Sequence, residues 1–553
     1  MKHCLAVLLF ALGVLLPVAG GGLPLFAQSA DAPAAEASVA ADRALLDALQ
    51  RDAFSYMWDH AYPSGLAFEN NRYADGPATT GGTGFGAAAV VVATERGWIA
   101  REAAVDRLLT LTAFLRDKTE RSRLHGAFPH WLNGVTGATM PFGPQDVGAD
   151  IVETAFLMQG LIIARNYFDG DGPEAELRAR INELWHDVDW AWFTRGPSGS
   201  ENDGLYWHWS PEYGFAMNMK VTGFNEGMVA YVLALASPTH PIPSEAYAAW
   251  SSTDEYRPTG GNGYTLEAGI PYGGPLFITH YSYIGLDPRR LADDKVPHGY
   301  WVRNVTQTLM NRAYCLETAP RENRYAADCW GLTSCDAKDC YRYSAPGNDS
   351  GTVAPTAALS AMPYTPHYSM QVLEALNGRF RQAMWGPCGP YDAFSLRDDW
   401  YARTYQAIDQ LPIVCMVENY RSGLLWRLFM NDPDVKRGLD RAGLRPPRPA
   451  DGFPEMVVAL KPDGRGGHVP DACDLRRHPD TGLYAVPYQA NKGGAVVLTL
   501  TDPAGATRRT FHVRAAPGRN ELTFAFRPES PDAVHTLTLD TGDARHSLPL
   551  RLH

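Results

Sequence analysis

The chain changes its hydrophobic period once, and that change divides it into two parts. Between Asp42 and Leu444, apolar residues recur at three- and four-residue spacing, which predicts amphipathic helices. The clearest of these predicted helices span residues 43–58, 86–95, 101–116, 150–167, 174–193, 226–236 and 410–429. Several are apolar on almost every side, as at residues 155–158, so we expect them to be buried on more than one face. Inner helices of this kind fit a layered toroid better than a simple bundle.

A different pattern follows the proline-rich segment 445–449, which has the composition of a stiff linker. Short runs with strand-like composition occur at residues 495–500, 510–513, 522–526 and 535–539, with turn residues between them. We therefore expect a helical domain over residues 42–444 and a small all-β, sandwich-like accessory domain over residues 450–553. We expect this second domain to pack against the first rather than to bind carbohydrate.

The N-terminus has the order of a secretory signal peptide. Lys2 is followed by an apolar run over residues 5–18 and then by small residues near Ala27. The run is shorter than the ~20 residues that span a bilayer, which disfavours a retained membrane anchor. We expect residues 1–30 to be removed, the mature chain to begin near Asp31, and the protein to be periplasmic or secreted without a membrane attachment.

Composition narrows the classes of function. The chain is 45% hydrophobic and carries a formal net charge of −12, which excludes wholesale disorder and disfavours a general nucleic-acid binder. It contains 14 Trp and 26 Tyr, whose flat rings suit sugars but also fill large cores. The sequence has no zinc-protease or serine-hydrolase motif, and its Gly-rich segment at residues 83–86 lacks the Lys of a phosphate loop. We expect no cofactor and no metal.

Seven of the eight cysteines follow the predicted signal peptide, so at least one thiol stays free unless chains pair. An oxidising compartment would permit two disulfides within the cluster of Cys315, Cys329, Cys335 and Cys340. The cluster has no paired CxxC, which disfavours a zinc site. Cys415 lies in an apolar run and is expected to be a buried thiol.

Acidic residues are densest just before the predicted helix at 150–167. If that helix starts near Asp150, then Asp150 and Glu153 share a face, with Asp146 in the approaching loop. Crowded carboxylates raise at least one pKa, so that one of them can carry a proton near neutral pH. The same spacing resembles a capping box, and spacing alone favours that structural interpretation.

Two further acids precede apolar helices. Glu226 could pair with the positive end of its helix dipole or act in catalysis, and spacing does not decide between them. Asp409 could be a helix cap or a catalytic base. Glu418 and Arg421 are expected to form a structural ion pair.

Seven segments together resemble one family. They lie at residues 148–157, 206–209 (Tyr-Trp-His-Trp), 223–227 (Gly-Phe-Asn-Glu-Gly), 237–241, 277–282, 354–358 and 418–426 (Glu-Asn-Tyr-Arg-Ser-Gly-Leu-Leu-Trp). The sequence in these segments is similar to the glucoamylase-like domain of bacterial endo-β-1,2-glucanases, glycoside hydrolase family 144. The resemblance covers about residues 42–444; the C-terminal strands lie outside it, and the segment 315–340 departs from it.

The resemblance implies an (α/α)6 toroid with a central acidic cavity, and hydrolysis of β-1,2-glucan to sophoro-oligosaccharides with inversion. It favours catalytic roles for the acids in its motifs. Glu226 is the expected general acid, although its place at a helix start should lower its pKa unless Glu153 and Asp150 reverse that effect. Asp150, Glu153 and Asp409 remain alternatives for the base. The residues expected to bind substrate are Asp146, His130, Trp131, Asn225, His280, Tyr364, Trp385, Tyr391 and Arg421.

Three alternatives stay open: an exo-acting, sophorose-releasing hydrolase, a transglycosylase on β-1,2-glucans, and a non-catalytic glycan-binding protein. In each case the expected partner is β-1,2-glucan or a related oligosaccharide.

Overall fold

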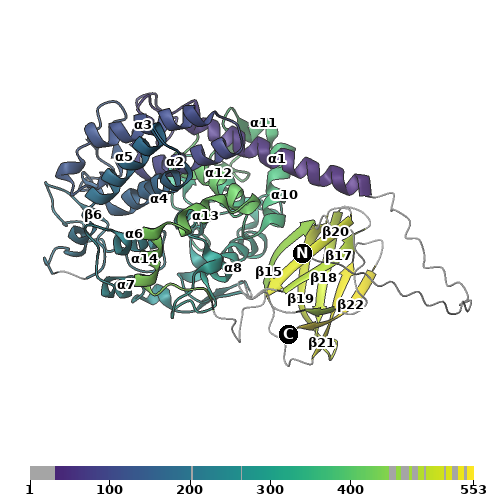
Figure 1. Cartoon of the computed structure of the whole chain (residues 1–553). Helices are drawn as coiled ribbons and strands as arrows, with labels where there is room; N and C mark the ends of the chain where they lie inside the picture. The colour runs from purple at the N-terminus through teal and green to yellow at the C-terminus, as the bar shows by residue number, and fades with distance from the viewer. Residues whose placement is uncertain are drawn as a thin grey trace, which may run out of the picture.

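The computed structural model describes residues 32–200, 203–262, 264–447, 456–462, 473–475, 484–490, 494–515, 518–525, 533–540 and 545–552. The predicted signal peptide and residues 448–449 of the linker therefore lie outside the described residues. In Figure 1 the helices form one body, and the C-terminal strands form a second body beside α10.

Fourteen α-helices lie in the described residues. They are α1 (Ala32–Trp58), α2 (Thr80–Glu95), α3 (Arg101–Asp117), α4 (Ile151–Tyr167), α5 (Pro173–Asp187), α6 (Met228–Ala236), α7 (Glu245–Trp250), α8 (Tyr300–Ala313), α9 (Pro355–Leu359), α10 (Pro366–Asn377), α11 (Arg381–Met384), α12 (Ala407–Arg421), α13 (Leu424–Met430) and α14 (Pro433–Ala442). The helices α12, α2, α4 and α6 pack side by side in that order and are almost wholly buried. Outer helices cover them: α1 packs on α12, α5 on α4 and α14 on α6. This two-layered arrangement fits the expected toroid.

Two predicted boundaries are wrong for identifiable reasons. The prediction for residues 410–429 is one helix, but Gly423 adopts a left-handed conformation (φ 65°) and separates α12 from α13. The prediction for residues 174–193 ends six residues too late as an α-helix, because α5 stops at Asp187 and a 3₁₀ turn, Trp190–Thr194, follows.

Helix α2 begins six residues before its predicted start, within a glycine-rich segment that resembles a loop in the sequence. Thr79 caps it by accepting a hydrogen bond from the N–H of Gly82. Glycine is required here by close approach: a Cβ at Gly84 would overlap the backbone of Phe156 in α4, and a Cβ at Gly160 would overlap the backbone of Gly84. The two inner helices thus meet backbone to backbone.

Short strands join the loops that precede the inner helices. One small sheet pairs β2 (Phe128–Pro129), β5 (Ala149–Asp150) and β6 (His208–Trp209). A second pairs β1 (Ala78–Thr79), β3 (Trp131–Leu132) and β4 (Thr139–Met140). Hairpins are formed by β7 (Thr259–Gly261) with β8 (Tyr264–Leu266), β9 (Cys335–Asp336) with β10 (Tyr341–Arg342), β11 (Trp385–Gly386) with β12 (Gly389–Pro390), and β13 (Phe394–Ser395) with β14 (Trp400–Tyr401).

The C-terminal strands form two sheets. One contains β15 (Met456–Pro462), β20 (Gly518–Ala525) and β17 (Tyr484–Ala490); the other contains β16 (Cys473–Leu475), β22 (Arg545–Leu552), β21 (Val534–Asp540), β18 (Gly494–Thr501) and β19 (Thr507–Ala515). All four strands expected from the sequence are present, and the sheets touch through β15 and β19. The first linker residue, Arg445, pairs with Ala292 of the helical body instead of extending freely.

Among the helices of the described residues, none has the combination of length and apolar character that crossing a bilayer requires.

Candidate active site

The candidate acids gather where the inner helices begin. Glu153 lies in the first turn of α4, Asp409 in the first turn of α12, and Glu226 in the turn that precedes α6. The N-terminal ends of these helices carry partial positive charge, which favours carboxylates there. The sequence predicts this grouping, because each acid directly precedes or opens an apolar helix.

Asp150 is the N-cap of α4, as the spacing favours. Its Oδ1 accepts hydrogen bonds of 2.9 Å from the backbone N–H groups of Val152 and Glu153. Its Oδ2 lies 3.1 Å from Nδ1 of His130 and accepts a 3.1 Å bond from Nε1 of Trp207. Both oxygens of this buried carboxylate are therefore occupied, so Asp150 is suited to positioning its neighbours rather than to activating water.

Glu153 and His130 form a coupled pair beside Asp150. Oε2 of Glu153 accepts a 2.7 Å hydrogen bond from the N–H of Gly81, which joins the first turns of α4 and α2. Burial raises the pKa of Glu153 to about 8, although the charge of His130 opposes this. Burial opposes protonation of His130, but Glu153 and Asp150 outweigh it and raise the pKa of the imidazole to about 10. His130 is therefore an imidazolium near neutral pH.

The backbone of Glu226 is held in place, and among the described residues no side chain bonds to its carboxyl group. The Ser282 hydroxyl donates to the Glu226 carbonyl oxygen and accepts a 3.0 Å bond from the N–H of Val229, which fixes the turn before α6. Burial raises the pKa of Glu226 to about 7, with a smaller contribution from Asp150. The expectation that the helix start lowers this pKa is wrong, because α6 begins two residues later and desolvation dominates.

Asp409 belongs to a buried group of three aspartates. Asp336 accepts hydrogen bonds from Arg72 (2.9 Å), Gln406 (3.1 Å) and Thr404, and its own N–H donates to Oδ2 of Asp392 at 2.7 Å. Within the described residues, no N–H or O–H group donates to either carboxyl oxygen of Asp409. Its side chain instead interacts with that of Asp392, which requires one of the two to be protonated.

Burial and this mutual repulsion raise the pKa of Asp392 to about 7 and that of Asp409 well above its ordinary value. The pair therefore retains a proton near neutral pH.

Tyr281 links these groups. It is 7% exposed; burial raises the pKa of its phenol, and the charges of Asp409, Glu226, Glu153 and Glu69 raise it further. One buried ring is thus electrostatically coupled to acids from four separate loops or helix starts, which places the acids around a common centre.

Three expected binding residues lie beside this centre. Oδ1 of Asp146 is 3.2 Å from Nε2 of His208, and Trp131 lies in β3 next to His130. The Asn225 side chain closes the turn that carries Glu226, by accepting a 2.8 Å bond from the N–H of Gly227.

His130, Asp146 and Asp150 place possible metal ligands within 4.8 Å of one another. The oxygens of Asp150 already interact with His130, Trp207 and two backbone N–H groups, so hydrogen bonding accounts for this cluster.

Two expected binding residues are part of the core instead. Tyr364 is fully buried and donates a 2.7 Å hydrogen bond to the carbonyl oxygen of Thr279. His280 is 1% exposed, lies parallel to the Tyr364 ring, and has a pKa lowered to about 3 by burial. Neither presents a surface to a sugar, so these two predictions are wrong.

Three more expected binding residues make contacts within the fold. Arg421 is at the opposite end of α12 from Asp409, about 18 Å along the axis at 1.5 Å per residue, and it pairs with Asp47. Glu418 pairs with Arg96 rather than with Arg421 as expected. Trp385 donates a 2.8 Å bond to Asp52 of α1.

Tyr391 packs on Tyr405, with 5.0 Å between ring centroids. Its contacts, like those of Arg421 and Trp385, are structural.

Three acids of the site were missed in the sequence. Glu69 is buried near His130, and its pKa is raised by burial. Glu69 lies in an irregular segment, Asp336 in a two-residue strand and Asp392 in a loop, and none of these segments has a periodic pattern. Their contribution arises only when distant loops meet.

The described cysteines Cys315, Cys329, Cys335, Cys340, Cys388 and Cys415 are all free thiols, and Cys415 is buried as expected. The two disulfides that an oxidising compartment would permit are therefore not formed. The side chain of Cys473 lies outside the described residues.

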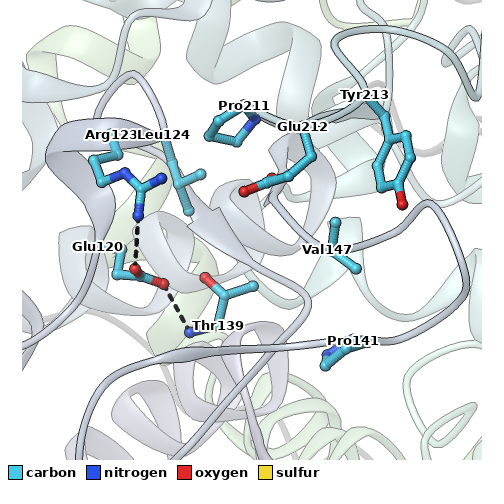
Figure 2. A pocket seen from close by; sticks show the side chains of 9 residues that line it. All are labelled: Glu120, Arg123, Leu124, Thr139, Pro141, Val147, Pro211, Glu212 and Tyr213. Atoms are coloured by element: carbon cyan, nitrogen blue, oxygen red, sulfur yellow. Dashed lines mark hydrogen bonds and ion pairs between the residues drawn. The ribbon is translucent and has the colours of Figure 1, made fainter.

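A surface pocket of about 340 Å³ borders the loop that carries Asp146 (Figure 2). The Glu212 carboxylate points into it and the Tyr213 ring stands at one side, while Glu120 accepts hydrogen bonds from Arg123 (3.2 Å) and the N–H of Thr139 (3.0 Å). Val147 lines it, next to Asp146 in the chain, but none of the candidate acids does. The pocket therefore adjoins the acid group without being part of it.

Comparisons with known proteins identify the family of the helical domain. Residues 218–433 match the family model described as "Putative glucoamylase". An exo-β-1,2-glucooligosaccharide sophorohydrolase (non-reducing end) of Parabacteroides distasonis is 40% identical over 426 residues, which is 72% of this chain and 58% of that protein. The chain thus corresponds to little more than half of the length of this relative.

Two solved structures match over nearly their whole length. An endo-β-1,2-glucanase of Chitinophaga pinensis, in complex with sophorotriose and glucose, is 44% identical with a TM-score of 0.69, covering 73% of this chain and 98% of that one. A protein of Bacteroides uniformis named as a glucoamylase is 43% identical with a TM-score of 0.69, covering 73% of this chain and 97% of that one.

Proposed function

Because this chain belongs to the glucoamylase-like glycoside hydrolase family that includes bacterial endo-β-1,2-glucanases, we propose that it hydrolyses β-1,2-glucan to sophoro-oligosaccharides. The reaction proposed is a single displacement by water with inversion at the anomeric carbon. Such a reaction needs one protonated carboxyl group and one group that accepts a proton from water. The observation that carries the proposal is that two such groups, Glu226 and the Asp392–Asp409 pair, are buried where inner helices begin, and that Glu226 and Asp409 both act on the buried phenol of Tyr281.

Glu226 is the general acid in this proposal. With a pKa of about 7 it holds its proton through the acidic and near-neutral range, where an ordinary glutamate is ionised. Its proton passes to the glycosidic oxygen as the bond from that oxygen to the anomeric carbon breaks. No side chain engages the carboxyl group among the described residues, so it is free to meet the substrate.

Asp409, acting with Asp392, is the base. The two carboxyl groups share one proton and one negative charge, and burial makes that charge strongly basic. Water attacks the anomeric carbon while its proton passes to this pair; the proton is then returned to solvent, and Glu226 is reprotonated. Glu153 is less suited because its Oε2 is bound to Gly81 and an imidazolium lies beside it.

The remaining acids and His130 position these groups. The His130 imidazolium stabilises Asp150 and Glu153, and Asp150 fixes the start of α4 and the Trp207 indole. Trp131, Asp146 and His130 are proposed to contact the bound glucan at the edge of the acid group.

The proposed cleavage mode is endo. The chain matches the C. pinensis endo-β-1,2-glucanase over almost all of that protein, whereas it spans 58% of the P. distasonis exo-acting enzyme. The part of the exo-acting relative that this chain does not match is available to supply end recognition.

The test is incubation of the purified protein with linear β-1,2-glucan, beside β-1,3- and β-1,4-glucans as controls. A ladder of sophoro-oligosaccharides from β-1,2-glucan alone, with α-anomeric products by NMR at early times, is expected. A single short product would favour the exo alternative, larger products would favour a transglycosylase, and binding without new reducing ends would contradict hydrolysis.

A further inference from the structure

The β9–β10 hairpin is fixed to the base side of the acid group. Asp336, at the end of β9, is 1% exposed and accepts hydrogen bonds from Arg72, Gln406 and Thr404. Its N–H donates to Asp392. Since Gln406 directly precedes α12, these contacts join the hairpin to the segment that presents Asp409.

Strand register sets which side chains of the hairpin face the acids. Tyr341 is paired with Asp336, and directly paired residues of an antiparallel hairpin project from the same face. Arg342 is paired with Cys335 and projects from the opposite face, where it forms an ion pair with the exposed Asp339. Tyr343 is two residues beyond Tyr341 and so returns to the first face.

Both tyrosines are open to solvent and yet couple to the acids. Tyr341 is 42% exposed and Tyr343 is 47% exposed. Burial of the phenol is the main cause that raises the pKa of each tyrosine; the charges of Asp409 and Asp392 add to it at Tyr341, and the charge of Glu226 adds to it at Tyr343. The register with Asp336, whose N–H bonds to Asp392, places Tyr341 on the side of the hairpin that carries the proposed base, and Tyr343 follows on the same face; part of each side chain is open to solvent while its phenol is shielded.

Tyrosine presents a flat apolar face that can lie on the C–H face of a pyranose ring, and its hydroxyl can bond to sugar hydroxyls. Because both pKa values are raised, the two phenols stay protonated and can donate hydrogen bonds at working pH.

We propose that the hairpin is a substrate-binding arm, in which Tyr341 and Tyr343 contact glucosyl units on the two sides of the cleaved bond and Asp336 positions the arm. This assignment rests on the proposed function, because the acid and the base define the two sides. It makes the segment 335–343 a determinant of how the glucan chain is aligned for cleavage.

The test measures binding and turnover separately. In a Glu226→Gln background, titration calorimetry with linear sophoropentaose should show that Tyr341→Ala and Tyr343→Ala each weaken binding by about tenfold or more. In the otherwise wild-type protein, the same variants should raise KM on β-1,2-glucan. Arg342→Ala, which changes the opposite face of the same strand, is the matched control and should leave both values unchanged.

Asp336→Asn tests the positioning role. It removes the charge that pairs with Arg72, and it should raise KM while the two tyrosines remain present. Circular dichroism checks that each variant is folded. If an alanine variant does not fold, the corresponding leucine variant, Tyr341→Leu or Tyr343→Leu, takes its place.

If the wild-type protein cleaves β-1,2-glucan while both tyrosine variants keep wild-type affinity and KM, the proposal of a substrate-binding arm is wrong and the proposed function stands. If wild-type protein neither cleaves nor binds β-1,2-glucan, the proposed function fails and the arm fails with it.

Discussion

The backbone N–H of Asp336 donates a 2.7 Å hydrogen bond to Oδ2 of Asp392, and this directs the buried carboxyl group of Asp392 toward that of Asp409. The bond stabilises negative charge on Asp392, so the shared proton lies on Asp409 and Asp392 carries the charge that accepts the proton of water; replacing Asp409 removes the proton that the pair shares. The two carboxyl groups can therefore act together as one base.

Replacing Asp409 tests this base. Asp409→Asn should lower kcat on β-1,2-glucan by about 10²–10⁴-fold, the usual contribution of general base catalysis. Asp399→Asn is the control, because Asp399 is exposed in the loop before β14 and asparagine tolerates the φ of 45° at this position. A normal kcat for Asp409→Asn, with a large loss for Glu153→Gln, would move the base to Glu153.

Glu226→Gln keeps the shape of the side chain but removes its transferable proton. We expect kcat to fall by about 10²–10⁴-fold with little loss of glucan binding, and wild-type kcat to decline above about pH 7 as Glu226 ionises. Turnover and melting temperature should be measured on the same sample, with Glu212→Gln as an exposed control. A near-normal kcat would remove Glu226 from the mechanism.

The raised pKa of Glu226 also predicts how stability depends on pH. A carboxyl group whose pKa is raised by folding binds more protons in the native than in the unfolded state, so the native state loses stability as pH rises. For Glu226 this loss should develop between about pH 4.5 and pH 7. The difference in melting temperature, Glu226→Gln minus wild type, should therefore increase by about 1–3 °C between pH 5 and pH 8. If the melting temperatures of the two proteins changed equally with pH, a buried, protonated Glu226 would be contradicted. Glu322→Gln, at an exposed site, is the control, and its melting temperature should follow that of the wild type at every pH.

The domain boundary can be placed by truncation. The N–H of Arg445 donates a 3.0 Å hydrogen bond to the carbonyl oxygen of Ala292, its carbonyl oxygen accepts a 2.7 Å bond from the N–H of Ala292, and its guanidinium pairs with Asp294. A chain ending at Pro447 should thus remain helical and soluble, with a higher melting temperature than one ending at Leu444. Loss of soluble expression in both would show that the C-terminal strands complete the helical domain.

Export remains a prediction from the N-terminal sequence. The apolar run at residues 5–18 and the small residues after it predict cleavage near Asp31. Intact-mass analysis of protein recovered from the periplasm or the medium should give a chain starting within a few residues of Asp31. Recovery of a chain that retains Met1 would contradict this expectation.

Periodicity predicted the inner helices because their burial leaves a strong apolar signal, as at α4 and α6. Periodicity failed to predict the first residues of α2. These residues are glycines, which suggest a loop in the sequence, but they are helical and pack directly against the backbone of α4. The acids that open helices, Asp150, Glu153, Glu226 and Asp409, could be found from their positions.

Residues brought in by irregular loops could not be found in this way. Glu69, Asp336 and Tyr341 have no local pattern, and their roles depend on contacts across hundreds of residues. Aromatic richness was a poor guide for the opposite reason: Tyr364 and Tyr391 satisfy the packing of a large helical core, and sequence does not distinguish that use from sugar binding.

The contact between Gly84 and Gly160 has a practical consequence for redesign. Side chains around the acids can change rotamer to admit a different glycan, but two touching backbones cannot move apart without shifting α2 and α4 as whole helices. Those helices carry Gly81 and Glu153, so any enlargement made there would be transmitted to the acids themselves. Attempts to change glycan preference are therefore best directed to the hairpin at residues 335–343, where half-exposed side chains can be exchanged while the helical frame keeps its dimensions.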